Sequence, residues 1–269
     1  MLDIIRAIFL GIVEGITEWL PISSTGHMIL VNEFIGGDAF FSKDLFLYGI
    51  QLGAILAILT LYFRKLNPFA LSKTAEEKKS TWEMWFKVII ACLPAAVIGL
   101  ALDKYMVYFE TPYVIAATLI IYGVAFIIVE NMKKSAPVVN SIEKMSYKTA
   151  LLIGAFQVLS IIPGTSRSGA TILGAILLGC SRQMAAEFSF FLAIPVMFGV
   201  SFLKLISFDY AAGDPNWLLL AVAMVVAYAV SMAAVKFLTD FVKKHDFKVF
   251  GWYRIVLGIL VIAYFMIFA

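Results

Sequence analysis

Six long, predominantly apolar runs without a charged side chain limit what this chain can fold into. Such a run is typical of a helix that crosses a bilayer, because about 20 apolar residues span the hydrocarbon core. Charged residues make up only 14% of the 269 positions, whereas a soluble domain has roughly 25%. The sequence therefore predicts an all-α integral membrane protein. The six predicted transmembrane helices are Leu45–Phe63, Val88–Leu102, Thr111–Val129, Phe188–Leu203, Pro215–Val235 and Ile255–Ala269.

Two further apolar segments are interrupted by polar motifs and do not fit a simple span. Segment 1–35 contains Glu14, Glu18 and the run Pro-Ile-Ser-Ser-Thr-Gly-His at 21–27. Segment 149–181 contains Pro-Gly-Thr-Ser-Arg-Ser-Gly at 163–169. A helix broken at membrane depth is tolerated only where its freed backbone groups face protein or a water-filled cavity. Both segments are therefore predicted to be re-entrant helix hairpins, which leave the membrane on the side they entered.

The distribution of Lys and Arg predicts the orientation. These residues number six in 64–87, four in 131–148 and four in 239–254. They number one in 31–44, one in 103–110 and none in 207–216. The positive-inside rule places the first three segments in the cytoplasm and the other three outside. With six spans, this alternation requires both hairpins to be re-entrant, the first entering from outside and the second from the cytoplasm.

The two halves of the chain are related by a shift of 143 positions, which aligns the two hairpins. The aligned pairs are Gly11 with Gly154, Glu14 with Gln157, Thr17 with Ser160, Ser23 with Ser166, Thr25 with Ser168, and Gly26 with Gly169. Each half has one hairpin and three spans, so the halves insert with opposite orientation. We expect a single membrane domain, 1–269, built as an inverted-topology repeat of 1–130 and 149–269. Broken helices in such repeats typically place a binding site where the repeats meet.

Glu14 and Glu18 are four residues apart and therefore share one face of a helix. Two ionised carboxylates are unfavourable in a low dielectric unless they share a proton or bind a cation. A hard divalent ion, Mg²⁺ or Ca²⁺, suits two carboxylates together with phosphate oxygens. Both residues are therefore predicted metal ligands. The alternative is a pair that lines a water-filled vestibule and takes no part in chemistry.

His27 closes the first polar motif, directly after Ser23, Ser24 and Thr25. An imidazole can act as a general base, and a nearby hydroxyl can then act as a nucleophile. The alternative is a buried histidine that only satisfies a backbone carbonyl.

Arg167 stands between two apolar arms of the second hairpin, where a charge is costly and needs an anionic partner. Thr165, Ser166 and Ser168 beside it are donors, and Gly164 lets backbone N–H groups approach a ligand closely. A glycine-rich break that opens onto a helix N-terminus favours anions, and a guanidinium matches phosphate bidentately.

Together these groups predict a phosphoryl-transfer site made of acids with a metal, a nucleophile with a base, and an arginine. The alternative for Arg167 is a structural ion pair with Glu14 or Glu18, which is compatible with a catalytic role.

The motifs Glu-Gly-Ile-Thr-Glu at 14–18, Pro-Ile-Ser-Ser-Thr-Gly-His at 21–27 and Pro-Gly-Thr-Ser-Arg-Ser-Gly-Ala-Thr at 163–171 resemble the signatures of a known family. The family is that of the bacitracin-resistance type undecaprenyl-diphosphate phosphatases, and the likeness covers essentially the whole chain. It implies an enzyme that hydrolyses undecaprenyl diphosphate to the monophosphate carrier of peptidoglycan synthesis and raises tolerance of bacitracin. It also implies a divalent metal and a place in the bacterial cytoplasmic (inner) membrane, with the active site open to the periplasmic or outer face.

The resemblance also assigns roles to residues of this sequence. Glu14 and Glu18 would serve metal binding and acid–base work, and Ser24 or His27 would attack. The residues expected to hold the substrate with Arg167 are Ser23, Thr25, Gly164, Thr165, Ser166, Ser168 and Thr171. Our hypothesis is that Ser24 attacks the terminal phosphorus with His27 as base. Attack by water or by His27 itself is the alternative.

A second class of function is transport, since broken helices in inverted repeats are the usual architecture of secondary transporters. The same charged residues could serve a flippase for a lipid phosphate or a transporter for a small anion. The net charge of +3 is too small and dispersed to indicate nucleic acid as a partner. The sequence leaves open the oligomeric state, which allows a homodimer, as well as the metal and the preferred lipid length.

Overall fold

The computed structural model describes residues 1–35, 39–132, 136–208 and 215–268, and its regular elements there are helices apart from one isolated bridge, Val139–Cys180. The all-α prediction is confirmed. The α-helices are α1 (Leu2–Thr17), α2 (Ser24–Ile35), α3 (Asp44–Leu61), α4 (Phe63–Leu66), α5 (Ala75–Met106), α6 (Pro112–Met132), α7 (Tyr147–Val158), α8 (Arg167–Leu177), α9 (Arg182–Ile206), α10 (Trp217–Lys244) and α11 (Lys248–Phe268). Parts of the predicted segments 31–44, 131–148 and 207–216, and residue 269, lie outside the described residues.

Six helices (α3, α5, α6, α9, α10 and α11) are long and apolar enough to cross a membrane, and each coincides with one predicted span. The chain is a membrane protein, and α7 and α8 are shorter apolar helices. Several helices extend beyond the uncharged runs: α5 begins at Ala75 rather than Val88, and α10 continues to Lys244. Long charged side chains can lie along apolar surface and still reach the interface. Absence of charge therefore marks the middle of a membrane helix, not its ends.

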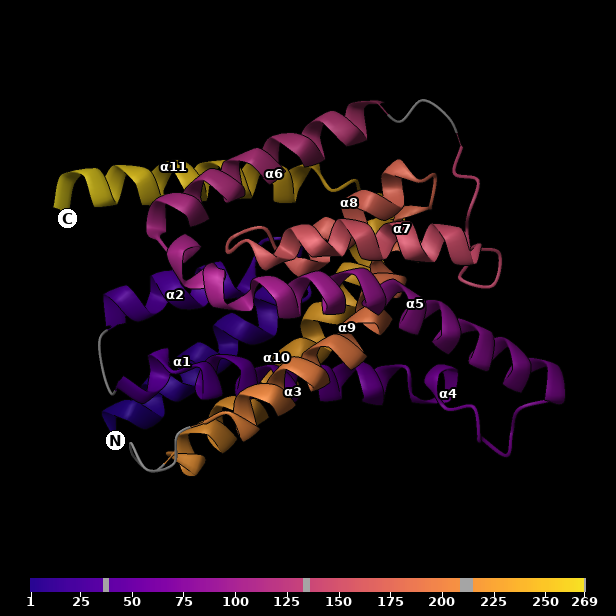
Figure 1. Ribbon diagram of the computed structural model, residues 1–269, viewed down its shortest axis with the longest axis horizontal. Coiled ribbons are helices and arrows are strands. Elements are labelled where there is room, and N and C mark those ends of the chain that lie inside the picture. Colours follow the sequence, from indigo (N-terminus) through magenta and orange to yellow (C-terminus); the bar gives the residue numbers. More distant parts are fainter. Residues whose placement is uncertain (36–38, 133–135, 209–214, 269) are drawn as a thin grey trace.

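Both predicted hairpins are pairs of helices that fold back on themselves. The Arg6 guanidinium near the start of α1 donates to the Ile35 carbonyl at the end of α2, at 3.2 Å. In the second pair, the Ser181 N–H after α8 donates to the Val139 carbonyl before α7, at 2.8 Å. The two ends of each pair therefore lie close together. Figure 1 places both chain termini at one end of the molecule and α4 towards the other.

The two breaks have the same local geometry. Among the described residues other than glycine, only Ser23 and Ser166 have positive φ, at 77° and 74°. Each hydroxyl accepts a hydrogen bond from the backbone N–H three residues on, Gly26 at 3.3 Å and Gly169 at 3.0 Å. These are the pairs that the shift of 143 positions aligns.

The first helix of each hairpin packs against a long helix of the other half. A Cβ on Gly11 of α1 would lie 2.7 Å from the Ala223 carbonyl oxygen of α10. A Cβ on Gly154 of α7 would overlap the Ala91 carbonyl oxygen of α5. Small residues at such contacts let membrane helices approach closely. The halves are therefore interlocked at matched positions.

Ion pairs and hydrogen bonds hold the basic end of the molecule together. Lys65 pairs with Glu187 at 2.8 Å, and Lys87 donates to the carbonyls of Ile142 and Glu143 at 2.9 and 3.0 Å. Lys87 of α5 and residues 142–143 before α7 therefore lie side by side.

The position of Arg254 differs from the one predicted from the distribution of Lys and Arg. We assigned its charge to a cytoplasmic loop, 239–254, and that assignment is wrong. Arg254 lies inside α11 and its side chain is fully buried. A charge count treats every arginine that flanks an uncharged run as a loop residue and cannot recognise one whose partners are backbone carbonyls.

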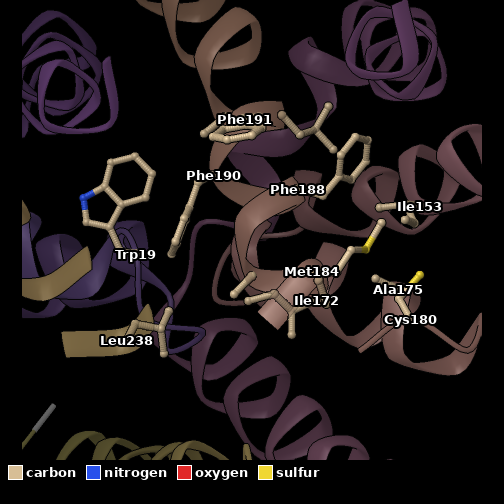
Figure 2. Packing of buried hydrophobic residues seen from close by; sticks show 14 of the residues in the cluster. Trp19, Ile153, Ile172, Ala175, Cys180, Met184, Phe188, Phe190, Phe191 and Leu238 are labelled. Atoms are coloured by element: carbon tan, nitrogen blue, oxygen red, sulfur yellow. The ribbon is translucent and has the colours of Figure 1, made fainter. Parts of the chain in front are cut away.

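The largest buried cluster lies around α9, beside the first break. Trp19, directly after Glu18, has no exposed surface, and its ring meets Phe190 edge-on at a centroid distance of 5.6 Å. Figure 2 shows this pair with Phe188 and Phe191 in the same cluster. Such an aromatic pair contributes about 0.5–1.5 kcal/mol beyond the area it buries. This packing fixes the end of α1 against α9.

Gly154→Ala should lower the thermal unfolding midpoint of the detergent-solubilised protein, whereas Gly199→Ala should not. Both changes remove a glycine from a helix interior, which by itself favours the helix by about 1 kcal/mol. The new methyl group would overlap the Ala91 carbonyl at Gly154 but meets nothing within 4 Å at Gly199. Equal midpoints, measured by tryptophan fluorescence, would contradict the close packing of α7 on α5.

Candidate active site at the two helix breaks

Glu18 is the meeting point of the two breaks. One carboxylate oxygen, Oε1, accepts a hydrogen bond from Arg167 Nη2 at 2.8 Å. The other, Oε2, accepts a short hydrogen bond from Ser24 Oγ. The side chains of Glu18 and Arg167 are 7% and 11% exposed, so the pair is largely shielded from solvent. Three of the four predicted catalytic residues are thus joined through Glu18, and the ion pair given as the alternative for Arg167 is present, with Glu18 as the partner.

Arg167 is held in place by groups of α9 and the first break. Its Nη1 donates to the Ser189 carbonyl at 2.7 Å, and its Nη2 lies 3.8 Å from the Met197 sulfur. The guanidinium carbon is 6.0 Å from the Trp19 ring centroid, within range of a cation–π contact. The positive charge is therefore oriented before any substrate binds.

Glu14 lies one helical turn before Glu18 and is 1% exposed. Its Oε1 has no hydrogen-bond partner within the described ranges of the chain. An unpaired polar atom in an apolar interior is costly, so this oxygen is suited to a ligand. The described residues hold no group of three or more His, Cys, Asp and Glu side chains that could bind a metal alone. The two glutamates fit a hard cation that takes its other ligands from phosphate and water.

The hydrogen bonds of His27 go to groups other than the Ser24 hydroxyl that it was predicted to activate. Its Nδ1 is 2.7 Å from the Ser23 carbonyl, and its Nε2 is 2.7 Å from the Tyr253 hydroxyl of α11. The Ser24 hydroxyl bonds to Glu18 instead. Tyr253 was missed by sequence reasoning, since nothing in its local sequence indicates a partner 226 positions away.

The predicted donors of the second break bond largely within the protein. Ser168 Oγ lies 3.3 Å from the carbonyl oxygens of both Glu18 and Leu20. Thr171 Oγ1 lies 2.8 Å from Ser189 Oγ, and Ser166 Oγ caps α8. These hydroxyls tie the second break to the first and to α9. Their contact with a substrate phosphate remains a prediction.

The remaining predicted residues belong to the two breaks. Thr25 is half-buried in the first turn of α2, and Thr165 is 1% exposed. Gly164 has φ +85°, a conformation that L side chains rarely adopt.

A single guanidinium, that of Arg254, hydrogen-bonds to backbone carbonyls of both breaks. Its Nη1 donates to the Pro21 carbonyl at 3.1 Å. Its Nη2 donates to the carbonyls of Gly164 at 2.8 Å and Thr165 at 2.9 Å. Non-helical backbone at membrane depth leaves carbonyl groups without partners, and Arg254 supplies them on both sides at once.

Comparison with known proteins identifies relatives along nearly the whole chain. The family model described as "Bacitracin resistance protein BacA" matches residues 7–260. An undecaprenyl-diphosphatase of Acetivibrio thermocellus is 57% identical, covering 99% of each chain. One of Enterococcus faecalis is 56% identical over 97% of each chain, and one of Lactobacillus delbrueckii subsp. bulgaricus is 57% identical over 100% of each.

Arg254→Met should destabilise the protein strongly, because it leaves the carbonyls of Pro21, Gly164 and Thr165 without their donor. An unsatisfied buried acceptor costs about 1–3 kcal/mol, so we expect a clear fall in the unfolding midpoint in detergent. Arg64→Met is the matched control, since Arg64 is exposed on α4. A midpoint for R254M equal to that of R64M would contradict the bridging role.

Proposed function

Because the chain belongs to the BacA family of bacitracin resistance proteins, we propose that it is an undecaprenyl-diphosphatase whose reaction takes place at Glu18, Ser24 and Arg167. The observation that carries this assignment is the double contact of Glu18 with a hydroxyl and a guanidinium. Phosphoryl transfer needs a nucleophile, a base to take its proton, and positive charge for the phosphate oxygens. The enzyme releases inorganic phosphate and undecaprenyl phosphate.

Ser24 is the nucleophile that the contacts favour, and Glu18 is its base. Ser24 Oγ attacks the terminal phosphorus, its proton passes to Glu18, and the bond to the bridging oxygen breaks, so that undecaprenyl phosphate leaves. Water then attacks the phosphoserine. Glu18 returns its proton to Ser24 Oγ as the phosphorus–serine bond breaks, takes up the proton that the water loses, and releases that proton to solvent as inorganic phosphate leaves. His27 is less suited to this step, because both its ring nitrogens have other partners.

Arg167 changes partner during substrate binding. The phosphate oxygens compete with Glu18 for the guanidinium, and bidentate phosphate contacts suit its planar donors. Moving Arg167 from Glu18 to phosphate frees Glu18 Oε1 and strengthens Glu18 as a base. The other residues that we assign to substrate binding are Ser23, Thr25, Gly164, Thr165, Ser166, Ser168 and Thr171.

Glu14 and Glu18 would hold the divalent cation, Mg²⁺ or Ca²⁺. A carboxylate has about four lone-pair positions, so Glu18 can bind a cation beside its present partners. The bound cation supplies positive charge to the phosphate oxygens of the substrate. The unpaired Oε1 of Glu14 is the atom that supports this assignment.

We also infer that both hairpins are re-entrant, that the halves form an inverted repeat, and that the site opens to the outer face. Support comes from the joined ends of each hairpin, the matched φ values of Ser23 and Ser166, and the exchanged packing of α1 on α10 and α7 on α5. The basic segment before α5 lies at the opposite end from both termini (Figure 1), and basic segments face the cytoplasm.

The purified protein in detergent should release phosphate from undecaprenyl diphosphate, and Glu18→Gln and Arg167→Ala should each remove most of this activity. Loss of a general base typically costs about 10²–10⁴-fold. Loss of a group that stabilises developing charge costs about 10²–10³-fold in kcat. Inorganic phosphate and the monophosphate lipid are both quantified.

The control for this assay is an ion pair with one buried partner, because removing the other partner leaves a buried charge unpaired and lowers stability without touching the site. Arg182 pairs with Glu130 at 2.5 Å, outside the contacts of Glu18. Arg182→Ala should lower the unfolding midpoint but keep turnover. Hydrolysis that persists in both site variants would contradict the assigned site.

Chelation with EDTA should stop phosphate release, and Mg²⁺ or Ca²⁺ should restore it. Glu14→Gln should raise the metal concentration needed for half-maximal activity, because it removes one charged ligand. Glu130→Gln changes a buried glutamate outside the site and serves as control. Turnover that EDTA leaves unchanged would overturn the metal assignment while leaving the phosphatase assignment intact.

A further inference from the structure

His27 is held at both ring nitrogens by groups from two different helices. Nδ1 meets the Ser23 carbonyl of the first break, and Nε2 meets the Tyr253 hydroxyl of α11, each at 2.7 Å. The two rings are stacked, with centroids 5.7 Å apart and planes inclined by 8°. Few orientations of the imidazole satisfy all three contacts.

These partners determine where the proton of a neutral His27 lies. A carbonyl oxygen only accepts, so Nδ1 must carry the proton and donate to Ser23. Nε2 then has only its lone pair, which accepts the hydrogen bond of the Tyr253 hydroxyl. Neither nitrogen can take a proton from Ser24 without first losing a partner.

The Ser23 carbonyl belongs to a strained residue. Its φ of 77° lies in the left-handed region, which residues with a side chain rarely adopt. Ser24 comes next, and its hydroxyl contacts Glu18. The direction of the Ser23 peptide group therefore sets where the Ser24 side chain begins.

The second break shows that a histidine is not needed to form this turn. Ser166 has φ 74°, and Ala170 stands where His27 stands in the first break. Arg254 holds the neighbouring carbonyls of Gly164 and Thr165 there. The histidine is present only at the break that carries the Ser24–Glu18 pair.

We propose that Tyr253 and His27 are positioning residues: Tyr253 fixes the tautomer and orientation of His27, and His27 holds the Ser23 carbonyl so that Ser24 faces Glu18. The proposal rests on the proposed function, with Ser24 as nucleophile. It assigns Tyr253 to the reaction and removes His27 from the role of general base.

His27→Asn and His27→Gln separate the two nitrogens. The amide of asparagine places an N–H near the position of Nδ1 and can still donate to Ser23. The amide of glutamine reaches towards Nε2 and leaves the Ser23 carbonyl with a single donor, the backbone N–H of residue 27 at 3.1 Å. We expect kcat for undecaprenyl diphosphate to fall less than about 10-fold in H27N but on the order of 100-fold in H27Q and H27A, the loss that a small misplacement of a reacting group produces.

The pH–rate profile and a double variant distinguish positioning from proton transfer. H27N should keep every limb of the wild-type profile, since no titrating catalytic group has been removed. Tyr253→Phe should lower kcat about 3–10-fold with little change in KM, and should add nothing on a His27→Ala background, because residues that act in series are not additive. Tyr264→Phe removes the same atom farther along α11 and should leave kcat unchanged.

Each outcome bears on the proposal separately from the function. H27Q more active than H27N, loss of one limb of the profile in H27N, or additive losses in the double variant would overturn the positioning role. A phosphate label on His27 in a trapped intermediate would do the same.

Wild-type protein that releases no phosphate would instead refute the proposed function. Unfolding midpoints of all variants should match the wild type, and a fall confined to H27Q would attribute its loss to folding and overturn the comparison.

Discussion

The buried ion pair between Glu18 and Arg167 is the interaction on which the rest of this structure depends. Both side chains are largely shielded from solvent, and an unpaired buried charge is costly, so the two breaks that carry them must meet. The surroundings enforce that meeting from both sides: Trp19 packs on Phe190 of α9, and α9 holds the arginine through the Ser189 carbonyl. The exchanged packing of α1 and α7 on the long helices of the opposite half then follows as the way to bring both breaks to one place.

A break in an apolar helix frees backbone groups that need hydrogen-bond partners. In this chain, side chains supply those partners. Ser23 and Ser166 take up left-handed backbone conformations and cap the following helices with their own hydroxyls. Arg254 supplies donors to carbonyls of both breaks from a helix that contributes no motif of its own. The polar residues of the two motifs therefore satisfy backbone groups as well as forming the candidate site. Most hydroxyls of the second motif are hydrogen-bonded to backbone groups in the absence of a ligand.

Much of this arrangement could be predicted, because the features concerned leave local signals. Uncharged runs locate the six long helices, Pro and Gly with polar neighbours locate the breaks, and a lone intramembrane arginine predicts an acidic partner, which is Glu18. Arg254 and Tyr253 leave no such signal, since their partners are a backbone carbonyl and a ring nitrogen more than 200 positions away. The pair Glu130–Arg182 was also missed, because its two residues lie 52 positions apart and at the ends of uncharged runs, where a charge is expected to face solvent. The sequence suggests His27 as the base for Ser24, whereas the contacts favour Glu18. Two residues that are close in sequence at the start of a helix can point in different directions, so their spacing does not show that they touch.

The same ion pair explains how a charged site can be stable in an apolar surrounding without substrate and still become reactive when substrate binds. Separating Glu18 from Arg167 with nothing in exchange would leave two unpaired buried charges, which costs several kcal/mol. A phosphate that enters takes over the guanidinium as Glu18 releases it, so the positive charge keeps a partner throughout. In the proposed reaction, Glu18 would lose Arg167 only when the phosphate is in place beside Ser24, and a cation held by Glu14 and Glu18 would offset the added negative charge. Base strength is thereby tied to the presence of substrate, and the hydroxyl is activated when there is phosphorus to attack.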